Sequence, residues 1–119
     1  MLQAIYPSLT YVLWPVLKGL THIRALTGKD VKTRIKERYG HSTTPRPDGK
    51  KVIWIHAASN GEALSALPLI DHFQKLGHPP HIVMTTMTVT ASDLLKKRVE
   101  PQNFTHQFIP LDHPRWIKR

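Results

Sequence analysis

Residues Lys51 to Glu62 read KVIWIHAASNGE, and this stretch decides the fold. The apolar run 52–55 ends at His56, a loop of small residues follows, and Glu62 opens a predicted helix. A short apolar run bounded by turn residues indicates a buried β-strand. A strand, a tight turn and a helix N-terminus in succession form the place where α/β proteins hold ligands, because unpaired backbone N–H groups converge there.

The residues after this stretch continue the alternation of strand and helix. Besides the strand at 52–56, the pattern predicts a helix over 62–76, a strand over 81–86, a helix over 90–99 and a short strand over 105–109. Such a β-α-β-α-β series implies a parallel sheet with right-handed crossovers. We therefore predict an α/β fold in which residues 51–119 form a partial Rossmann-like parallel sheet, about half of a complete domain.

The residues before this stretch divide into an apolar segment, a basic segment and a linker. Apolar side chains in 2–26 recur at steps of three and four, which predicts an amphipathic helix. Pro7 and Pro15 interrupt that pattern, so we expect the helix to be kinked or split. The linker HSTTPRPDGK at 41–50 is rich in turn-forming residues. Segment 1–40 is therefore expected to be separate from the sheet.

The N-terminal segment fits a helix that lies in a membrane surface. Its uncharged part, residues 1–17, is shorter than the about 20 apolar residues that a membrane span requires. Tyr6, Tyr11 and Trp14 suit the depth of the lipid headgroups. Ten of the 17 basic residues lie between Lys18 and Lys51, where they would meet anionic lipid on the cytoplasmic side. A helix packed against its own domain, or against a partner, is the alternative.

The composition limits the classes of partner and chemistry. The chain has 119 residues, 17 basic against 8 acidic side chains, and a formal net charge of +9. Such an excess suits nucleic acid, anionic lipid, or a phosphorylated or sugar-acid substrate. The chain contains no cysteine, which excludes disulfides, zinc–cysteine sites and a thiol nucleophile.

Glu62 is the candidate catalytic residue. It lies at the carboxyl end of the first predicted strand, where open α/β sheets bind their ligands. A carboxylate there can act as a general base. Acidic residues are also common in the first turn of helices, because they complement the helix dipole. Position and spacing leave both interpretations open.

Polar and small residues beside Glu62 are candidates for substrate binding. Ser59 or Asn60 can cap the helix, and Gly61 permits close approach to the backbone. Thr86 and Thr88 end the second strand in a hydroxyl-rich turn that suits sugar or phosphate oxygens.

Asp112 follows the third predicted strand, so three strand ends would face one cleft. The threonines and Asp112 could instead simply cap helices. The chain has neither a P-loop nor a GxGxxG fingerprint, and its eight histidines show no metal-ligand spacing. We therefore expect no metal site and no cofactor.

Four ordered motifs resemble those of a known family. They are KxRxKERYG from Lys32 to Gly40, HAASNGEALSALPLI from His56 to Ile70, TTMTVTA from Thr85 to Ala91, and IPLDHP from Ile109 to Pro114. Together they resemble the N-terminal domain of the 3-deoxy-D-manno-octulosonic acid (Kdo) transferases of lipopolysaccharide synthesis. The resemblance covers essentially the whole chain.

The resemblance implies a fold and an activity. The family has the two-domain GT-B fold of glycosyltransferases, and its N-terminal domain binds a lipid A precursor as acceptor at the cytoplasmic face of the bacterial inner membrane. The donor CMP-Kdo binds mainly to the C-terminal domain, and transfer inverts the anomeric centre. By this resemblance Glu62 is the base that deprotonates the acceptor hydroxyl. Asn60 differs from the family's usual aliphatic residue, as do Val89 and Ala91 from its usual Pro and Gly.

The same resemblance implies that the chain carries only the acceptor half. The donor-binding domain is absent from 1–119, so we expect the chain to be inactive alone. The alternatives are a non-catalytic membrane-associated module of a truncated or split gene, and a transferase of another sugar specificity. Nucleic-acid binding is disfavoured, because the basic residues cluster beside an apolar helix rather than among aromatic-studded strands.

Overall fold

The computed structural model describes residues 2–28 and 31–118, with the backbone alone over 2–7, so the predicted depth of Tyr6 lies outside the described side chains. The chain forms two compact units. We call Thr44–Phe108 the sheet unit, and Met1–Thr43 together with Ile109–Arg119 the helical unit. The division between Thr43 and Thr44 falls inside the proline-rich stretch at 41–50. Residues 109–119 group with the N-terminal segment rather than with the sheet.

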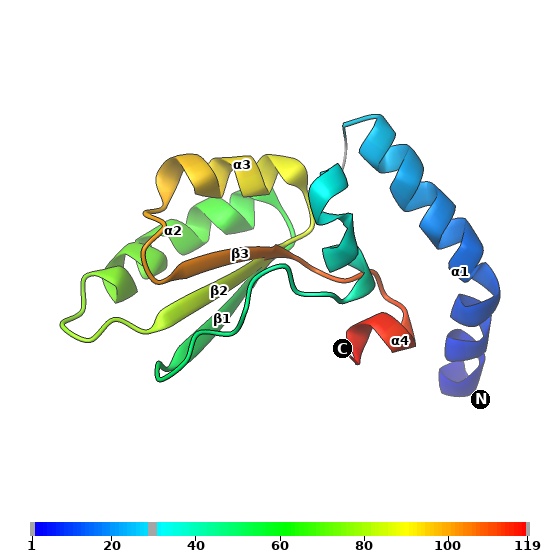
Figure 1. Cartoon of the computed structure of the whole chain (residues 1–119), viewed down its shortest axis with the longest axis horizontal. Coiled ribbons are helices and arrows are strands. Elements are labelled where there is room, and N and C mark those ends of the chain that lie inside the picture. The colour runs from blue at the N-terminus through cyan, green and yellow to red at the C-terminus, as the bar shows by residue number, and fades with distance from the viewer. Residues whose placement is uncertain (1, 29–30, 119) are drawn as a thin grey trace. The chain divides into compact units, whose positions relative to one another are not determined.

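The sheet unit has the predicted β-α-β-α-β order. Strands β1 (Val52–Ala57), β2 (His81–Thr86) and β3 (Phe104–Phe108) form a parallel sheet in the order β1-β2-β3. Helices α2 (Asn60–Gln74) and α3 (Val89–Arg98) make the crossovers, and both lie over the same face of the sheet (Figure 1). The α/β class and the parallel sheet are thereby confirmed.

The core of the sheet unit lies between the sheet and its two helices. Successive residues of a strand point to opposite faces, so alternate positions of β1 and β2 reach this layer. Its fully buried members are small or aliphatic: Ala57, Ala63, Ile70, Ile82, Met84, Ala91 and Leu95. The apolar run at 52–55 adds only the partly buried Ile55 to this core, so β1 is less buried than the sequence predicted.

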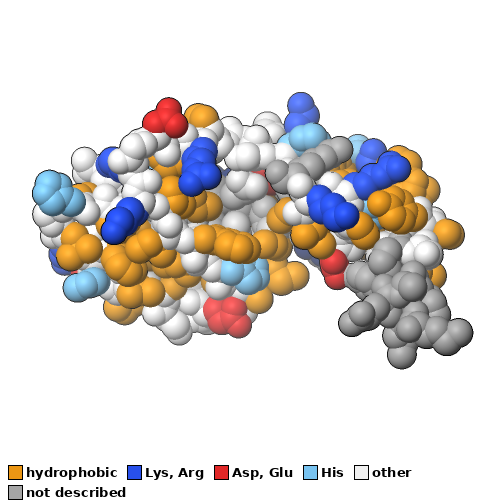
Figure 2. All heavy atoms as spheres, turned by 90° about the horizontal axis from the view of Figure 1, so that it is seen from below, with side chains coloured by type: hydrophobic (Ala, Val, Ile, Leu, Met, Phe, Trp, Pro, Cys, Tyr) orange, Lys and Arg blue, Asp and Glu red, His pale blue; other side chains and the backbone are white. Residues whose placement is uncertain are grey.

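The opposite face of the sheet carries polar and aromatic side chains. Trp54 Nε1 of β1 donates a hydrogen bond of 2.9 Å to Thr85 Oγ1 of β2. His56 Nδ1, also on β1, forms a second hydrogen bond of 2.9 Å with the same hydroxyl. The Trp54 side chain is 66% exposed. His81 Nε2 lies 2.8 Å from Thr105 Oγ1, and burial, with a smaller effect of the Lys50 ammonium, lowers the pKa of His81. Figure 2, seen from below Figure 1, shows hydrophobic side chains with histidine among them on this side of the sheet unit.

In the helical unit, α1 (Leu2–Leu26) is a single helix that continues through both Pro7 and Pro15. The predicted split is therefore absent, since the remaining backbone hydrogen bonds suffice to continue the helix past each missing N–H. No helix in the described part of the chain is long and apolar enough to cross a membrane.

The apolar stripe of α1 is exposed, whereas small polar positions are buried. Among the side chains of α1 that the structure describes, those of Thr10, Thr21 and the apolar Ala25 are buried. The exposed stripe comprises Leu9, Val12, Val16, Leu20, Ile23 and Leu26, each more than half exposed. The helix thus does not use this stripe to pack against its own unit.

The motif KERYG holds the two ends of the helical unit together. It lies in η1, a 3₁₀ helix over Lys32–Tyr39. The backbone oxygen of Arg38 accepts a hydrogen bond of 2.9 Å from Leu111 N. The guanidinium of Arg38 donates a second hydrogen bond, of 3.4 Å, to the backbone oxygen of Ile109. Gly40 has φ 78°, and a Cβ there would lie 2.0 Å from the backbone oxygen of Trp116. Trp116 belongs to the short helix α4 (Pro114–Ile117).

Two charged residues of this motif are buried, which limits the predicted lipid-facing role of the basic block. Glu37 is fully buried, and Arg38 is 3% exposed. The Glu37 carboxylate accepts two hydrogen bonds from Arg34, from Nε at 3.0 Å and from Nη2 at 2.9 Å, and a third from Thr43 Oγ1. Arg34 and Arg38 are thus committed to contacts within the chain.

Candidate active site at the end of strand β1

The turn after β1 is closed by two reciprocal hydrogen bonds. Ser59 is the N-cap of α2, and its Oγ accepts from Glu62 N at 3.2 Å. Glu62 Oε2 accepts in return from Ala58 N at 2.6 Å. This pattern is close to a capping box, in which the third helical residue reaches back to the residues before the helix. It explains why α2 begins at Asn60, two residues before the predicted start.

The Glu62 carboxylate is held but remains accessible. The residue is exposed, and its hydrogen bond to Ala58 N engages only Oε2. Oε1 makes no hydrogen bond to any residue in the described part of the chain. Glu62 is therefore a first-turn acid, as one interpretation of the sequence required, and it has one oxygen available for a second role.

Gly61 is not required by the packing of the protein. Its φ lies outside the left-handed region, and the nearest atom to a Cβ placed there is Ser59 Oγ at 3.9 Å. The space beside its backbone is therefore open.

The turns after β1 and β2 meet through Asn60. Asn60 Oδ1 accepts hydrogen bonds from Thr88 Oγ1 at 3.3 Å and from Thr90 Oγ1 at 3.2 Å. Thr88 is also the N-cap of α3 and accepts from Ala91 N. The prediction did not include Thr90, although its position two residues after a capping threonine placed it in the same turn.

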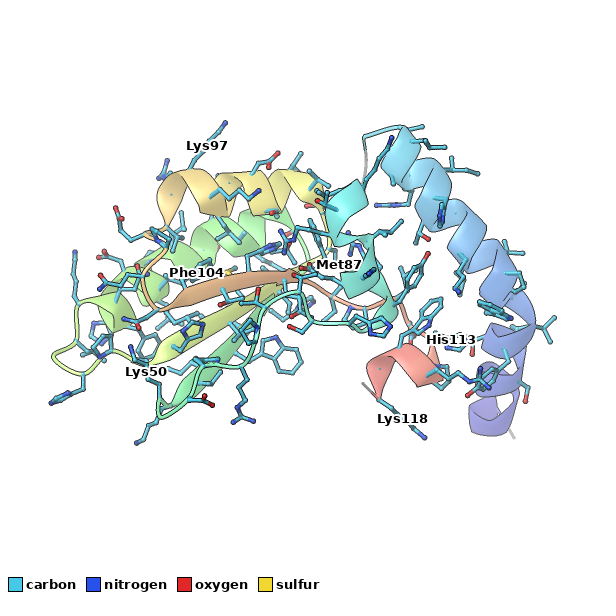
Figure 3. All side chains as sticks on the ribbon, in the orientation of Figure 1. Lys50, Met87, Lys97, Phe104, His113 and Lys118 are labelled. Carbon is cyan, nitrogen blue, oxygen red and sulfur yellow. The ribbon has the colours of Figure 1, made fainter. Side chains whose placement is uncertain are left out.

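Thr86 differs from the other candidate residues because it is fully buried. Its Oγ1 lies 2.7 Å from His106 Nε2, and His106 Nδ1 lies 3.3 Å from Ser92 Oγ. The hydroxyl of Thr86 is thus engaged inside the sheet unit, below the surface on which Glu62 lies. Met87, which follows it, is exposed at the end of β2 (Figure 3).

Asp112 follows the third strand, where the sequence placed a third group of candidate residues. It belongs to the helical unit and is exposed there. Among the residues that the structure describes, no group of three or more His, Cys, Asp or Glu side chains could hold a metal ion. The site at the end of β1 therefore offers a carboxylate oxygen, an amide and two threonine hydroxyls, which are groups suited to bind and deprotonate a hydroxyl-bearing substrate.

The family model of the 3-deoxy-D-manno-octulosonic-acid transferases matches residues 33–119. The chain belongs to the Kdo transferase family. A probable mitochondrial Kdo transferase of Arabidopsis thaliana is 39% identical to it over 97% of the chain and 25% of the relative. Kdo transferases of Rickettsia bellii and Haemophilus influenzae are each 34% identical over 94% and 96% of the chain, and over 26% of the relative in both cases.

The resemblance seen in the sequence motifs is thus confirmed. The chain spans about a quarter of the length of these three relatives. No solved structure matches it. The family match includes both the turn at Glu62 and the segment Ile109–Pro114.

Proposed function

We propose that this chain supplies the acceptor side of an inverting Kdo transfer from CMP-Kdo to a lipid A precursor, with Glu62 as general base. The observation that carries the proposal is the geometry of the carboxylate. The Ala58 N–H holds Oε2 at 2.6 Å, and Oε1 stays available on an exposed residue at the carboxyl end of β1. Ligands bind at this edge of open parallel sheets.

The proposed reaction uses Glu62 for one proton. The acceptor hydroxyl oxygen attacks the anomeric carbon of Kdo while its proton passes to Glu62 Oε1. The bond between that carbon and the CMP phosphate oxygen breaks, and CMP leaves with the electron pair. Attack from the face opposite CMP inverts the anomeric centre. Donor CMP-Kdo would be bound mainly by a second domain, so residues 1–119 are expected to be inactive alone.

Gly61 and the Asn60 cluster support substrate binding at the same turn. Gly61 is free of packing demands, and the absence of a side chain there leaves the α2 backbone open to close approach by a sugar. The hydroxyls of Thr88 and Thr90 share Asn60 Oδ1, which orients both beside the turn. In this proposal Ser59, Asn60, Gly61 and Thr88 contact the acceptor, while buried Thr86 positions the strand end.

We further propose that α1 places the acceptor site at the cytoplasmic face of the bacterial inner membrane. Its exposed apolar stripe would lie at the lipid surface, with basic residues beside anionic headgroups. Flotation with anionic vesicles tests this part. Val12→Glu and Val16→Glu should abolish flotation, whereas Leu69→Glu on α2 should not; equal loss in all three would contradict the proposal.

The central test is transfer by a grafted enzyme. Residues 1–119 replace the matching segment of the Haemophilus influenzae relative, and transfer of labelled Kdo to a lipid A precursor is measured. The graft should be active, and Glu62→Gln should lower its rate by about a hundredfold to ten-thousandfold. A graft that folds but does not transfer Kdo, or a Glu62→Gln graft that keeps the parent rate, would refute the proposal.

A further inference from the structure

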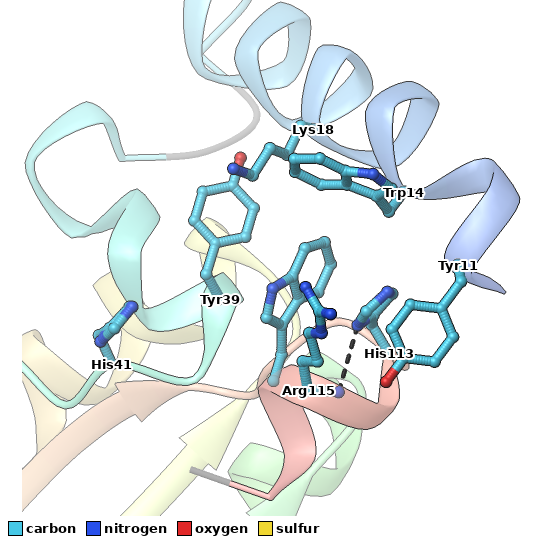
Figure 4. Close-up of a pocket in the computed structure, with 8 residues that line it drawn as sticks. Tyr11, Trp14, Lys18, Tyr39, His41, His113 and Arg115 are labelled. Atoms are coloured by element: carbon cyan, nitrogen blue, oxygen red, sulfur yellow. Dashed lines mark hydrogen bonds between the residues drawn. The ribbon is translucent and has the colours of Figure 1, made fainter. Parts of the chain in front are cut away.

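His113 and His106 differ in how their imidazole rings are held. His113 lines a pocket of the helical unit, where its Nδ1 accepts a hydrogen bond of 3.3 Å from Arg115 N (Figure 4). Its Nε2 is buried and has no hydrogen-bond partner among the described residues. His106 on β3 is half-buried, and both of its ring nitrogens form hydrogen bonds with side chains of other elements. A ring that is held at both nitrogens can fix the elements that it joins.

The ring of His106 joins strand β3 to strand β2 and to helix α3. His106 Nε2 lies 2.7 Å from Thr86 Oγ1 at the end of β2. His106 Nδ1 lies 3.3 Å from Ser92 Oγ, near the start of α3. Both partner residues are fully buried. The ring of Phe108 stands edge-on to the imidazole at a centroid distance of 5.0 Å. Three neighbours therefore fix the orientation of the His106 ring.

The direction of these hydrogen bonds follows from the Thr86 hydroxyl, which has a single proton. Thr86 Oγ1 donates to the backbone oxygen of Thr88 at 3.4 Å, because a carbonyl oxygen can only accept. The hydroxyl must then accept from His106, so the imidazole proton lies on Nε2. In the neutral ring Nδ1 is left as an acceptor, and Ser92 Oγ donates to it. One tautomer of His106 thus satisfies all three contacts.

Thr88 connects this arrangement to the candidate active site. It is the N-cap of α3, and its hydroxyl donates to Asn60 Oδ1 at 3.3 Å. The hydrogen bonds therefore lead from β3, through the end of β2, to the start of α2. The carboxylate of Glu62 is held separately, by the hydrogen bond of 2.6 Å from Ala58 N. His106 is thus linked to the polar groups beside the proposed base but not to the base itself.

We propose that His106 is a positioning residue that sets the affinity for the acceptor without contacting it. By holding the Thr86 hydroxyl, the ring fixes the turn after β2, which presents Thr88 and Asn60 to the acceptor. This role rests on the proposed function of the same turn. Because Glu62 is held by its own cap, loss of the His106 donor weakens acceptor binding and leaves the proton transfer unchanged. The acceptor KM then rises while kcat does not.

Two substitutions in the grafted transferase separate the Nε2 donor from the ring. In His106→Gln the amide can donate from near the position of Nε2, so the acceptor KM should stay within about threefold of the parent. The shorter side chain of His106→Asn reaches Ser92 but not Thr86, and the acceptor KM should rise about tenfold, the effect of one lost hydrogen bond. In both variants kcat should stay within about twofold of the parent. An equal rise in KM for both variants would overturn the proposal.

His81→Asn is the matched control. His81 Nε2 lies 2.8 Å from Thr105 Oγ1, so this pair also joins a histidine to a threonine across β2 and β3. His81 begins β2, at the edge of the sheet opposite the turn of Glu62. The free energy of unfolding is measured for both variants, and only His106→Asn should raise the acceptor KM. A rise that the two variants share would reflect a loosened sheet and would overturn the positioning role.

Nuclear magnetic resonance of the isotope-labelled, ungrafted chain tests the same role without activity. At a pH above the titration of the ring, the nitrogen resonances of His106 should show a proton on Nε2 and none on Nδ1. The side-chain amide resonances of Asn60 should shift in His106→Asn and stay at the parent positions in His81→Asn. A proton on Nδ1, or an unchanged Asn60 amide in His106→Asn, would overturn the proposal. A folded graft that transfers no Kdo would refute the proposed function, and the Asn60 amide would then decide alone whether His106 positions the turn.

Discussion

The motif ERYG and the turn NGE each combine a glutamate with a glycine, and the two pairs serve opposite purposes. Glu37 is fully buried and carries two hydrogen bonds from Arg34, whereas Glu62 is exposed and carries one bond from the backbone. Gly40 has a left-handed φ and no room for a Cβ. Gly61 has an ordinary φ and open space beside it.

This difference separates residues that build the fold from residues left free for a ligand. The buried charge of Glu37 is compensated by Arg34 and Thr43, so its contacts are already complete inside the chain. The turn at Glu62 is stable through its own caps and still presents an unused carboxylate oxygen. If substitutions in the two pairs changed the stability of the protein equally, this distinction would be wrong.

Glu37→Gln should have the largest effect on stability. It removes the negative charge beside the partly buried Arg34 guanidinium, and breaking a buried ion pair costs about 3–5 kcal/mol. Urea unfolding monitored by circular dichroism measures the loss. Asp71→Asn is the matched control, because the Asp71–Lys75 pair is exposed and its removal should cost about 0.5 kcal/mol or less. Equal losses would remove the distinction between the two kinds of carboxylate.

Gly40→Ala should have the next largest effect. The added Cβ would lie 2.0 Å from the Trp116 oxygen, so the backbone of α4 must move. Gly49→Ala is the control, since Gly49 has φ 71° but nothing within 4 Å of its Cβ position. Both variants carry the strain of a left-handed alanine, and Gly40→Ala should lose about 1–3 kcal/mol more because of overpacking. A smaller difference would contradict the role of Gly40 in holding α4.

Gly61→Ala should have the smallest effect on stability, with the opposite sign. Alanine is the better helix former, so the free energy of unfolding should be unchanged or rise by up to about 1 kcal/mol. In the grafted transferase the added methyl group would obstruct the acceptor, and transfer should fall about tenfold, the rate equivalent of roughly 1.4 kcal/mol. Unchanged transfer would show that the open space at Gly61 is not used by substrate.

Much of the sheet unit was predictable because its signals are local. The apolar run of β1 and the repeated strand–helix spacing predicted the parallel sheet. Ser59 or Asn60 was the predicted helix cap, and the structure shows that it is Ser59. The contact of Thr90 with Asn60 was not predictable, because it joins turns 30 residues apart. The alternation of strand and helix predicts which elements form, but not which side chains of two separate turns make contact.

The helical unit was predicted less completely for the same reason. Its basic residues look alike in sequence, yet Arg38 is buried while Arg115 lines a pocket. The two arginines differ in environment because residues 109–119 belong to the same compact unit as the N-terminal segment. This long-range association leaves no periodic pattern in the sequence. A helix lies where the sequence predicted one at 2–26, but only the structure shows that Leu9, Val12 and Val16 are exposed within their own unit.

The rate of Kdo transfer by the Glu62→Gln graft, measured beside its free energy of unfolding, tests the central claim most directly. Gln keeps an acceptor for the Ala58 N–H but cannot take a proton, so the cap survives and the base is lost. We predict a loss of transfer of about a hundredfold or more, with unfolding within about 1 kcal/mol of the parent. Full transfer at unchanged stability, or a loss of transfer that only parallels unfolding, would contradict the account.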